Sequence, residues 1–252
     1  MRNSSFFSNM PPVTKNLIII NFIIWLAMIV SPDRLGVNIE NIAGLHYFKA
    51  SEFYPWQLLT YMFLHSTQNF AHLLFNMFTL FMFGITIERV LGSARFLFYY
   101  VACGIGAAFC QEAAWAMTWE DSFVKIMANS NGVDFETVRQ AMAMGVPSVL
   151  QGEQQFLNML ITIGASGAIY GVLLAFGMLF PNRPLYLMFV PIPIKAKWMV
   201  IGYGVIELLI GVSSAHGVTD GVAHWAHLGG MIFGFFMIYY WKKCGAVHGD
   251  GY

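Results

Sequence analysis

Long apolar stretches separated by short polar segments dominate this chain. A helix that crosses the hydrocarbon core of a bilayer needs about 20 mostly apolar residues. Six stretches fit that length, at residues 15–31, 69–87, 96–117, 156–180, 197–214 and 222–241. The pattern predicts an all-α polytopic membrane protein, with six spanning helices that form a bundle in a single domain over residues 1–252.

Two longer segments between these stretches carry a different pattern. Residues 32–68 are rich in Tyr, Phe and Trp, which favour the membrane–water interface, so we expect a half-embedded first loop. Residues 118–155 form an extracytoplasmic insert. Helical spacing follows Asp134 and stops at Gly145, which predicts short surface helices there. No internal repeat is visible.

Composition supports the membrane interpretation. The chain has 252 residues, of which 58% are hydrophobic and only 10% are charged. An average soluble domain carries about 25% charged residues. The net charge is zero and no basic run occurs, so a nucleic-acid partner is not expected. Three cysteines without a CxxC pattern do not predict a disulfide framework, and no cofactor is expected.

Charge placement predicts the orientation. With the N-terminus in the cytoplasm, the six spans place nine of the thirteen Lys and Arg residues on the cytoplasmic side. The excess of basic residues on that side follows the positive-inside rule. Ten of the thirteen acidic residues then lie outside. We therefore expect an integral plasma (inner) membrane protein with both termini cytoplasmic. The first stretch is read as a spanning helix, with a cleaved signal peptide as the alternative.

Four polar side chains lie within apolar stretches where polar groups are costly. Ser166 lies in a Gly-Ala-Ser-Gly cluster typical of a turn that bears a nucleophile, and His227 lies in another stretch. His72 and Asn76 are four residues apart and share one helix face. The predicted topology puts all four in the outer half of the membrane. A serine, a histidine base and nearby hydrogen-bond donors are the parts of an acyl-transfer site.

Each of these groups has an expected role. His227 would take the proton of the Ser166 hydroxyl, and the two residues would act as a dyad. His72, Asn76 and the backbone N–H of Ser166 would stabilise the oxyanion. Tyr170 shares a helix face with Ser166 and would pack against the His227 ring. This dyad requires close helix approach, for which both stretches offer small residues at four-residue spacing: Gly167, Gly171 and Ala175, and Ala226, Gly230 and Gly234.

Other polar residues allow alternative interpretations. His224 and His227 form a His-x-x-His pair that could bind a metal, but the sequence offers no third ligand beside them, so no metal is expected. Glu207 lies in the fifth stretch and is interpreted as hydrogen-bonded or protonated in a structural role rather than a catalytic one. Asp220 lies too far out to complete a catalytic triad. No pair of aspartates in apolar stretches supports an aspartyl protease.

Taken together, the motifs resemble one known family. Gly164-Ala165-Ser166-Gly167, Ala226-His227-Leu228-Gly229-Gly230, His72 through Asn76, and Glu88-Arg89 followed by Gly92 are similar to the motifs of rhomboid-family intramembrane serine proteases. The resemblance covers residues from about 15 to 242 and is closest to the bacterial six-helix form. It implies a rhomboid-like six-helix bundle, catalysis by Ser166 and His227, and supporting positions at Gly164 and Tyr170.

The resemblance also implies a function. A rhomboid-type serine endopeptidase hydrolyses peptide bonds in or next to the transmembrane segments of other membrane proteins. The expected partners are transmembrane protein substrates and membrane lipid, and the active site would open to the extracytoplasmic side. The alternative is a catalytically inactive rhomboid-like factor that binds membrane proteins for quality control. A channel or transporter would show paired charges in several spans or symmetric repeats, which this sequence lacks.

Overall fold

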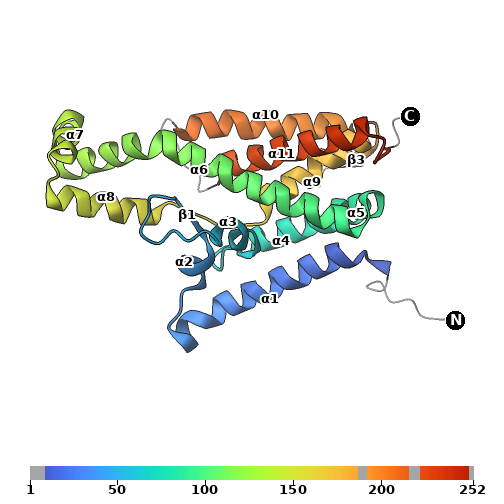
Figure 1. Cartoon of the computed structure of the whole chain (residues 1–252), viewed down its shortest axis with the longest axis horizontal. Coiled ribbons are helices and arrows are strands. Elements are labelled where there is room, and N and C mark those ends of the chain that lie inside the picture. The colour runs from blue at the N-terminus through green and yellow to red at the C-terminus, as the bar shows by residue number, and fades with distance from the viewer. Residues whose placement is uncertain (1–8, 187–191, 216–221, 250–252) are drawn as a thin grey trace.

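The computed structural model describes residues 9–186, 192–215 and 222–249. A set of helices lies side by side in one bundle (Figure 1). They are α1 (Pro12–Leu35), α4 (Phe70–Thr79), α5 (Ile85–Leu91), α6 (Ser93–Asn131), α9 (Ser166–Leu179), α10 (Ala196–Ala215) and α11 (His224–Lys243). Within the bundle, α11 packs mainly against α6 and α9.

Other elements connect these bundle helices. The segment between α1 and α4 contains α2 (Ile39–Ala43), β1 (Leu45–His46), α3 (Gln57–Thr60) and a 3₁₀ turn (Tyr61–Phe63). The remaining short elements are α7 (Phe135–Ala143), α8 (Pro147–Met159), β2 (Ile161–Thr162), β3 (Pro184–Tyr186) and β4 (Pro193–Lys195). Both strand pairs are antiparallel: β1 pairs with β2, and β3 with β4.

The expectation of an all-α polytopic membrane fold is confirmed. Among the described residues, four helical segments are long and apolar enough to cross a membrane: Pro12–Pro32, Phe70–Leu91, Ser93–Asn131 and Ala196–Ser213. Helix α9 is a shorter apolar helix. Helix α11, with 20 residues, is longer than the shortest of these four segments, but it contains two histidines and ends in two lysines.

The segment 70–91 runs as a continuous helical path through a π-helical turn at Leu80–Gly84, which joins α4 to α5. A π turn inserts one residue into the helical repeat and so rotates the faces on either side of it. His72 and Asn76 both precede this turn and therefore keep their shared face.

The stretch at 156–180 differs from the single helix expected there. Helix α8 stops at Met159, the chain becomes extended in β2, and α9 begins only at Ser166. Two features break the helix. The β2 backbone pairs with β1 of the first loop, and Gly164 has a φ of 131°, which a right-handed helix cannot include. Hydropathy alone could not reveal this break, because Leu160–Gly164 is mostly apolar.

The third apolar stretch also ends later than the pattern suggests. Helix α6 continues fourteen residues past 117, to Asn131, and stops where Gly132 adopts a left-handed φ of 66°. Its extension packs with α7 and α8 in a lobe at the left of Figure 1. At the start of α7, Asp134 Oδ1 accepts a hydrogen bond of 2.9 Å from the backbone N–H of Thr137. The first part of the region expected as an insert, residues 118–131, is therefore the end of α6, which projects from the bundle.

The first loop is packed into the protein and carries aromatic side chains on its outer surface. Leu45, Tyr61 and Met62 are buried in the main core. Phe48 and Trp56 are about half exposed, at 51% each. This combination suits a segment whose inner side packs on helices and whose outer side faces an apolar or interfacial environment.

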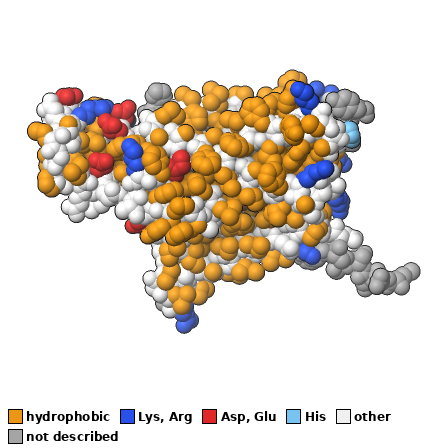
Figure 2. Space-filling model, viewed as in Figure 1, with side chains coloured by type: hydrophobic (Ala, Val, Ile, Leu, Met, Phe, Trp, Pro, Cys, Tyr) orange, Lys and Arg blue, Asp and Glu red, His pale blue; other side chains and the backbone are white. Residues whose placement is uncertain are grey.

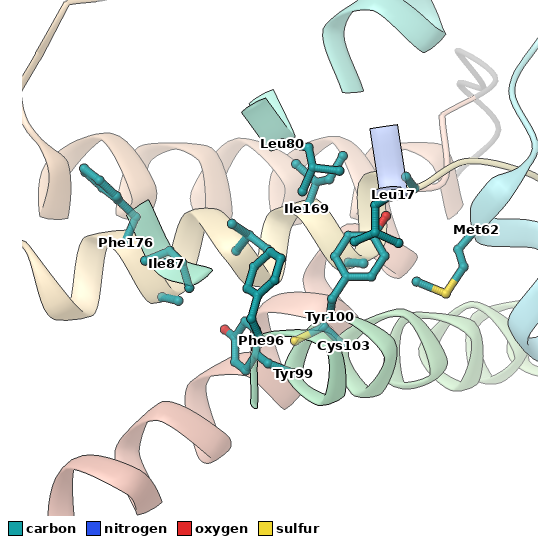
Figure 3. Close-up of a cluster of buried hydrophobic side chains, with 14 of the residues drawn as sticks. Leu17, Met62, Leu80, Ile87, Phe96, Tyr99, Tyr100, Cys103, Ile169 and Phe176 are labelled. Atoms are coloured by element: carbon teal, nitrogen blue, oxygen red, sulfur yellow. The ribbon is translucent and has the colours of Figure 1, made fainter. Parts of the chain in front are cut away.

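The main core lies where α1, α4, α6 and α9 meet (Figure 3). Tyr99 and Tyr100 of α6 are fully buried there, and the Tyr99 hydroxyl donates a 2.7 Å hydrogen bond to the Gly171 carbonyl of α9. Figure 2 shows apolar side chains over most of the bundle surface, with acidic side chains gathered at the α6–α8 lobe. The outside of this bundle is therefore suited to lipid.

Glu88 connects the first helix to the rest of the bundle. Its carboxylate accepts hydrogen bonds from the backbone N–H groups of Val13 and Thr14, at 3.0 and 2.7 Å. It also accepts from the hydroxyls of Thr14 and Ser93, each at 2.7 Å. A negative charge at the start of a helix satisfies unpaired N–H groups and complements the helix dipole.

Replacing this carboxylate should loosen α1. We expect Glu88→Ala to lower the free energy of unfolding by roughly 2–4 kcal/mol, because several hydrogen bonds to a buried charge are lost together. Thermal unfolding in detergent measures the change. The matched control is Glu136→Ala, which removes an exposed carboxylate from α7. Equal melting temperatures for the two variants would contradict this role for Glu88.

Candidate active site

Ser166 is the first residue of α9, at the end of a constrained turn. The turn is anchored by the β1–β2 pairing and by a 3.0 Å hydrogen bond from Gly164 N to the Tyr61 carbonyl. Backbone N–H groups at a helix start have no partner within the helix and point outward. The position therefore combines a half-buried hydroxyl with backbone donors suited to an anion.

His227 is brought to this serine by α11. Its Nε2 lies 2.7 Å from Ser166 Oγ, which is hydrogen-bond distance. The His227 side chain is buried, at 7% exposed, while Ser166 is half-buried. A hydroxyl that touches an imidazole nitrogen can transfer its proton during nucleophilic attack.

Tyr170 lies one helical turn after Ser166 and holds the imidazole from the side. Its ring stacks on the His227 ring, with centroids 4.2 Å apart and planes 7° from parallel. The stacking fixes the plane of the His227 imidazole ring and so the directions of its two nitrogen atoms. Its hydroxyl donates a short hydrogen bond to Glu207 Oε1 of α10.

Close helix packing makes this arrangement possible. A Cβ atom placed on Gly230 of α11 would lie 1.8 Å from the Gly167 carbonyl oxygen of α9. Only glycine allows the two backbones to approach this closely. Because Gly167 follows Ser166 and Gly230 is three residues after His227, the contact sets the spacing of the two side chains.

His72 of α4 faces the turn that carries Ser166. Its Nδ1 accepts a 3.3 Å hydrogen bond from the Ser66 backbone N–H, so the neutral ring carries its proton on Nε2. A Cβ on Gly164 would lie 2.8 Å from that Nε2. His72 therefore directs a donor at the serine turn.

His65 supports the ring of His72 from the loop before α4. The two ring centroids are 5.1 Å apart, and His65 is fully buried. Burial is the main cause that lowers the pKa of His65 to about 3, so this ring is neutral at physiological pH. A neutral neighbour adds no charge that would push a proton off His72.

Asn76 is buried on the same helix face as His72. Its side-chain amide nitrogen donates a 2.7 Å hydrogen bond to the His72 carbonyl, one turn earlier. One of its two N–H groups is thus used within α4, and the other has no hydrogen-bond partner among the described residues. The structure therefore differentiates the two expected donors: His72 points at the turn, and Asn76 is partly engaged with its own helix.

Glu207 is hydrogen-bonded within the bundle, through the Tyr170 hydroxyl and His224. Its Oε2 lies 2.6 Å from His224 Nδ1 and also 3.0 Å from His227 Nδ1, a neighbour that the sequence did not suggest. The expectation that the His-x-x-His pair has no third ligand is therefore wrong: Glu207, His224 and His227 form a group that could hold a metal ion. Asp220, the other acid considered, lies outside the described residues.

The fold and this site define a class: a polytopic, helical membrane protein with a serine–histidine pair inside the bundle. Comparison with known proteins identifies the family. The Rhomboid domain family model matches residues 52–244, and the chain belongs to the rhomboid family of integral membrane proteins.

Individual relatives agree with this membership. The chain is 28% identical over 228 residues to "Rhomboid protease AarA" of Providencia stuartii, covering 88% of this chain and 69% of the relative. It is 31% identical over 103 residues to the protein YdcA of Bacillus subtilis, covering 41% of this chain and 50% of the relative. "Rhomboid protein 1, mitochondrial" of Saccharomyces cerevisiae is 27% identical over 182 residues, with 72% and 40% coverage. The chain thus matches half of the Bacillus protein's length.

The glycine before the serine offers a direct test of the turn geometry. Gly164→Ala should slow covalent labelling of Ser166 by a fluorophosphonate probe about 100-fold, because a side chain at φ 131° would strain the turn and push against His72. Mass spectrometry of the labelled peptide measures the effect. Gly132→Ala is the matched control, since Gly132 also has a positive φ but its added Cβ would meet nothing within 4 Å. Similar labelling rates in both variants would show that Gly164 does not shape the site.

Proposed function

We propose that this protein is an intramembrane serine protease that hydrolyses peptide bonds in or next to transmembrane segments of other membrane proteins. The observation that carries the proposal is the 2.7 Å contact between Ser166 Oγ and His227 Nε2, within a rhomboid-family bundle. The relatives named as rhomboid proteases support the same class of activity.

The proposed reaction begins when a substrate carbonyl reaches Ser166. The Oγ–H proton moves to His227 Nε2, Oγ bonds the carbonyl carbon, and the carbonyl electron pair moves to oxygen. His72 Nε2–H, the Ser166 backbone N–H and the second side-chain N–H of Asn76 stabilise that oxyanion. The imidazolium then protonates the leaving amine, and water hydrolyses the acyl-enzyme by the same proton transfers.

The proposed orientation has both termini in the cytoplasm and the site open to the extracytoplasmic side of the plasma membrane. Lys242 and Lys243 end α11, while Ser166 begins α9 and His227 lies in the first turn of α11. The basic end of α11 therefore lies one helix length from the site, as the positive-inside rule requires for an outward-facing site. None of the residues in this proposed reaction comes from α7 or α8.

The alternative is a rhomboid-like protein that binds membrane proteins without cleaving them. Such a protein has no need for a serine hydroxyl in contact with an imidazole. The intact pair favours the enzyme, and the following tests separate the two functions.

Ser166→Ala and His227→Ala should each reduce cleavage of a transmembrane substrate by at least about 1,000-fold, because each removes one half of the proton-transfer pair. The double variant should lose no more than either single variant, since the two residues act as a unit. Purified protein in liposomes, assayed by gel and mass spectrometry, measures this. Ser213→Ala is the control, because the Ser213 hydroxyl donates a hydrogen bond to the Leu209 carbonyl of its own helix. Substantial cleavage by Ser166→Ala would refute the nucleophile assignment.

The oxyanion donors should act mainly on the rate. His72→Ala is expected to lower kcat about 100-fold with little change in KM, since the donor meets negative charge only in the transition state. Asn76→Ala should have a smaller effect, because one of its N–H groups is committed to the His72 carbonyl. A His72→Ala and Asn76→Ala double variant with wild-type kcat would make both residues purely structural.

A further inference from the structure

A carboxylate in an apolar helix requires an explanation. Glu207 lies in the middle of α10 and is only 6% exposed. A charge in a membrane span is expensive unless it is paired or hydrogen-bonded. Here the carboxylate has three polar neighbours: the Tyr170 hydroxyl on Oε1, and Nδ1 of His224 and His227 near Oε2.

The position of Glu207 relative to His227 is informative. His227 faces Ser166 with Nε2 and Glu207 with Nδ1, at 2.7 and 3.0 Å. The His227 ring thus lies between the nucleophile and the carboxylate, and it contacts each of them with a different nitrogen. A carboxylate beside Nδ1 favours the tautomer with its proton on Nδ1, which leaves the Nε2 lone pair for the serine proton.

The contact at Nδ1 is near but not ideally aligned. The His227 Nδ1 atom is buried and makes no well-directed hydrogen bond with any described residue, and Glu207 Oε2 is the carboxylate oxygen within reach. Catalytic hydrogen bonds are often long or poorly aligned without substrate and tighten when it binds. A small rotation of either side chain would align this pair.

Two neighbours hold the carboxylate in place. His224 is one helical turn from His227 and contacts the same oxygen at 2.6 Å. Tyr170 bonds the other oxygen while its ring stacks on His227. The residue that fixes the imidazole plane therefore also fixes the carboxylate, so acid and base are oriented together. Support of this kind gives a catalytic group one geometry.

A metal explanation fits the distances less well. In a tetrahedral zinc site with bonds of about 2.1 Å, neighbouring ligand atoms lie about 3.4 Å apart. Glu207 Oε2 lies 2.6 and 3.0 Å from the two histidine nitrogens, which is the spacing of direct hydrogen bonds. In this arrangement the carboxylate oxygen contacts both imidazole rings directly.

We infer that Glu207 is a positioning residue that completes a Ser166–His227–Glu207 triad, with His224 and Tyr170 holding its carboxylate. This inference rests on the proposed protease function. During attack the Ser166 proton moves to Nε2, the imidazolium forms, and Glu207 stays ionised and accepts the Nδ1–H hydrogen bond. No proton reaches the carboxylate.

The pH dependence follows from the groups around the imidazole. Among the described residues, the titratable groups that face His227 are Tyr170 of α9, Glu207 of α10, His224 of α11 and His72 of α4. Among them only Glu207 supplies a negative charge near neutral pH. That charge stabilises the imidazolium, so its removal should move the acidic limb of kcat/KM to lower pH.

The experiment compares Glu207→Gln with the wild-type protein in liposomes, using steady-state cleavage of a transmembrane substrate across pH. We expect kcat to fall at least about 100-fold, KM to change less than about twofold, and the acidic midpoint to fall by about one pH unit. Glu112→Gln is the matched control. Glu112 is a buried carboxylate of α6 that accepts a hydrogen bond from Phe48 N, and its variant should keep the wild-type kcat and pH profile.

A second measurement needs no variant at position 207 and no cleavage. Nitrogen-15 NMR of histidine-labelled wild-type protein, assigned with His227→Ala, reports which ring nitrogen of His227 carries the proton. The triad predicts a proton on Nδ1; a neutral ring with its proton on Nε2 would overturn it. This readout also decides the case if Glu207→Gln does not fold.

The outcomes separate this inference from the proposed function. Active wild-type protein with a Glu207→Gln variant that matches Glu112→Gln in kcat and pH profile refutes the positioning role and leaves the protease. Wild-type protein that cleaves no substrate refutes the protease, and the NMR result still tests the Glu207 contact. Wild-type activity lost in EDTA and regained with zinc would assign the three side chains to a metal and overturn the triad.

Discussion

The close contact of α9 with α11 is the constraint on which the site depends. Gly230 has no room for a side chain against the Gly167 carbonyl, so the two backbones meet at that point. Ser166 and His227 lie beside the contact and reach each other at 2.7 Å. Any larger residue would separate the helices and open that hydrogen bond. The packing of small residues here therefore serves chemistry as well as stability.

The second organising feature is how the nucleophile turn is held. The first loop supplies a strand and the Tyr61 carbonyl, which fix the extended backbone before Ser166. A loop buried against the bundle thus limits where α9 can begin. Ser166 therefore lies at a helix start, where backbone N–H groups have no partner within the helix, and the His72 donor faces the same turn.

Sequence patterns predicted the membrane fold and the family, because apolar length and closely spaced motifs are local properties. They did not predict that 156–180 would divide before Ser166, since strand pairing with residues 45–46 is a long-range event. They also assigned Glu207 only a structural role. A carboxylate in one apolar stretch and a His-x-x-His face in another were visible, but their meeting depends on how α10 packs against α11.

The most direct measurement is covalent labelling of the full-length protein in liposomes with a fluorophosphonate probe, followed by peptide mapping by mass spectrometry. A serine activated by the contact with His227 should carry the adduct at Ser166, and His227→Ala should react far more slowly. Exclusive labelling at Ser166 that depends on His227 is the predicted result. Absence of the adduct, or an equal rate in His227→Ala, would contradict an activated serine in this site.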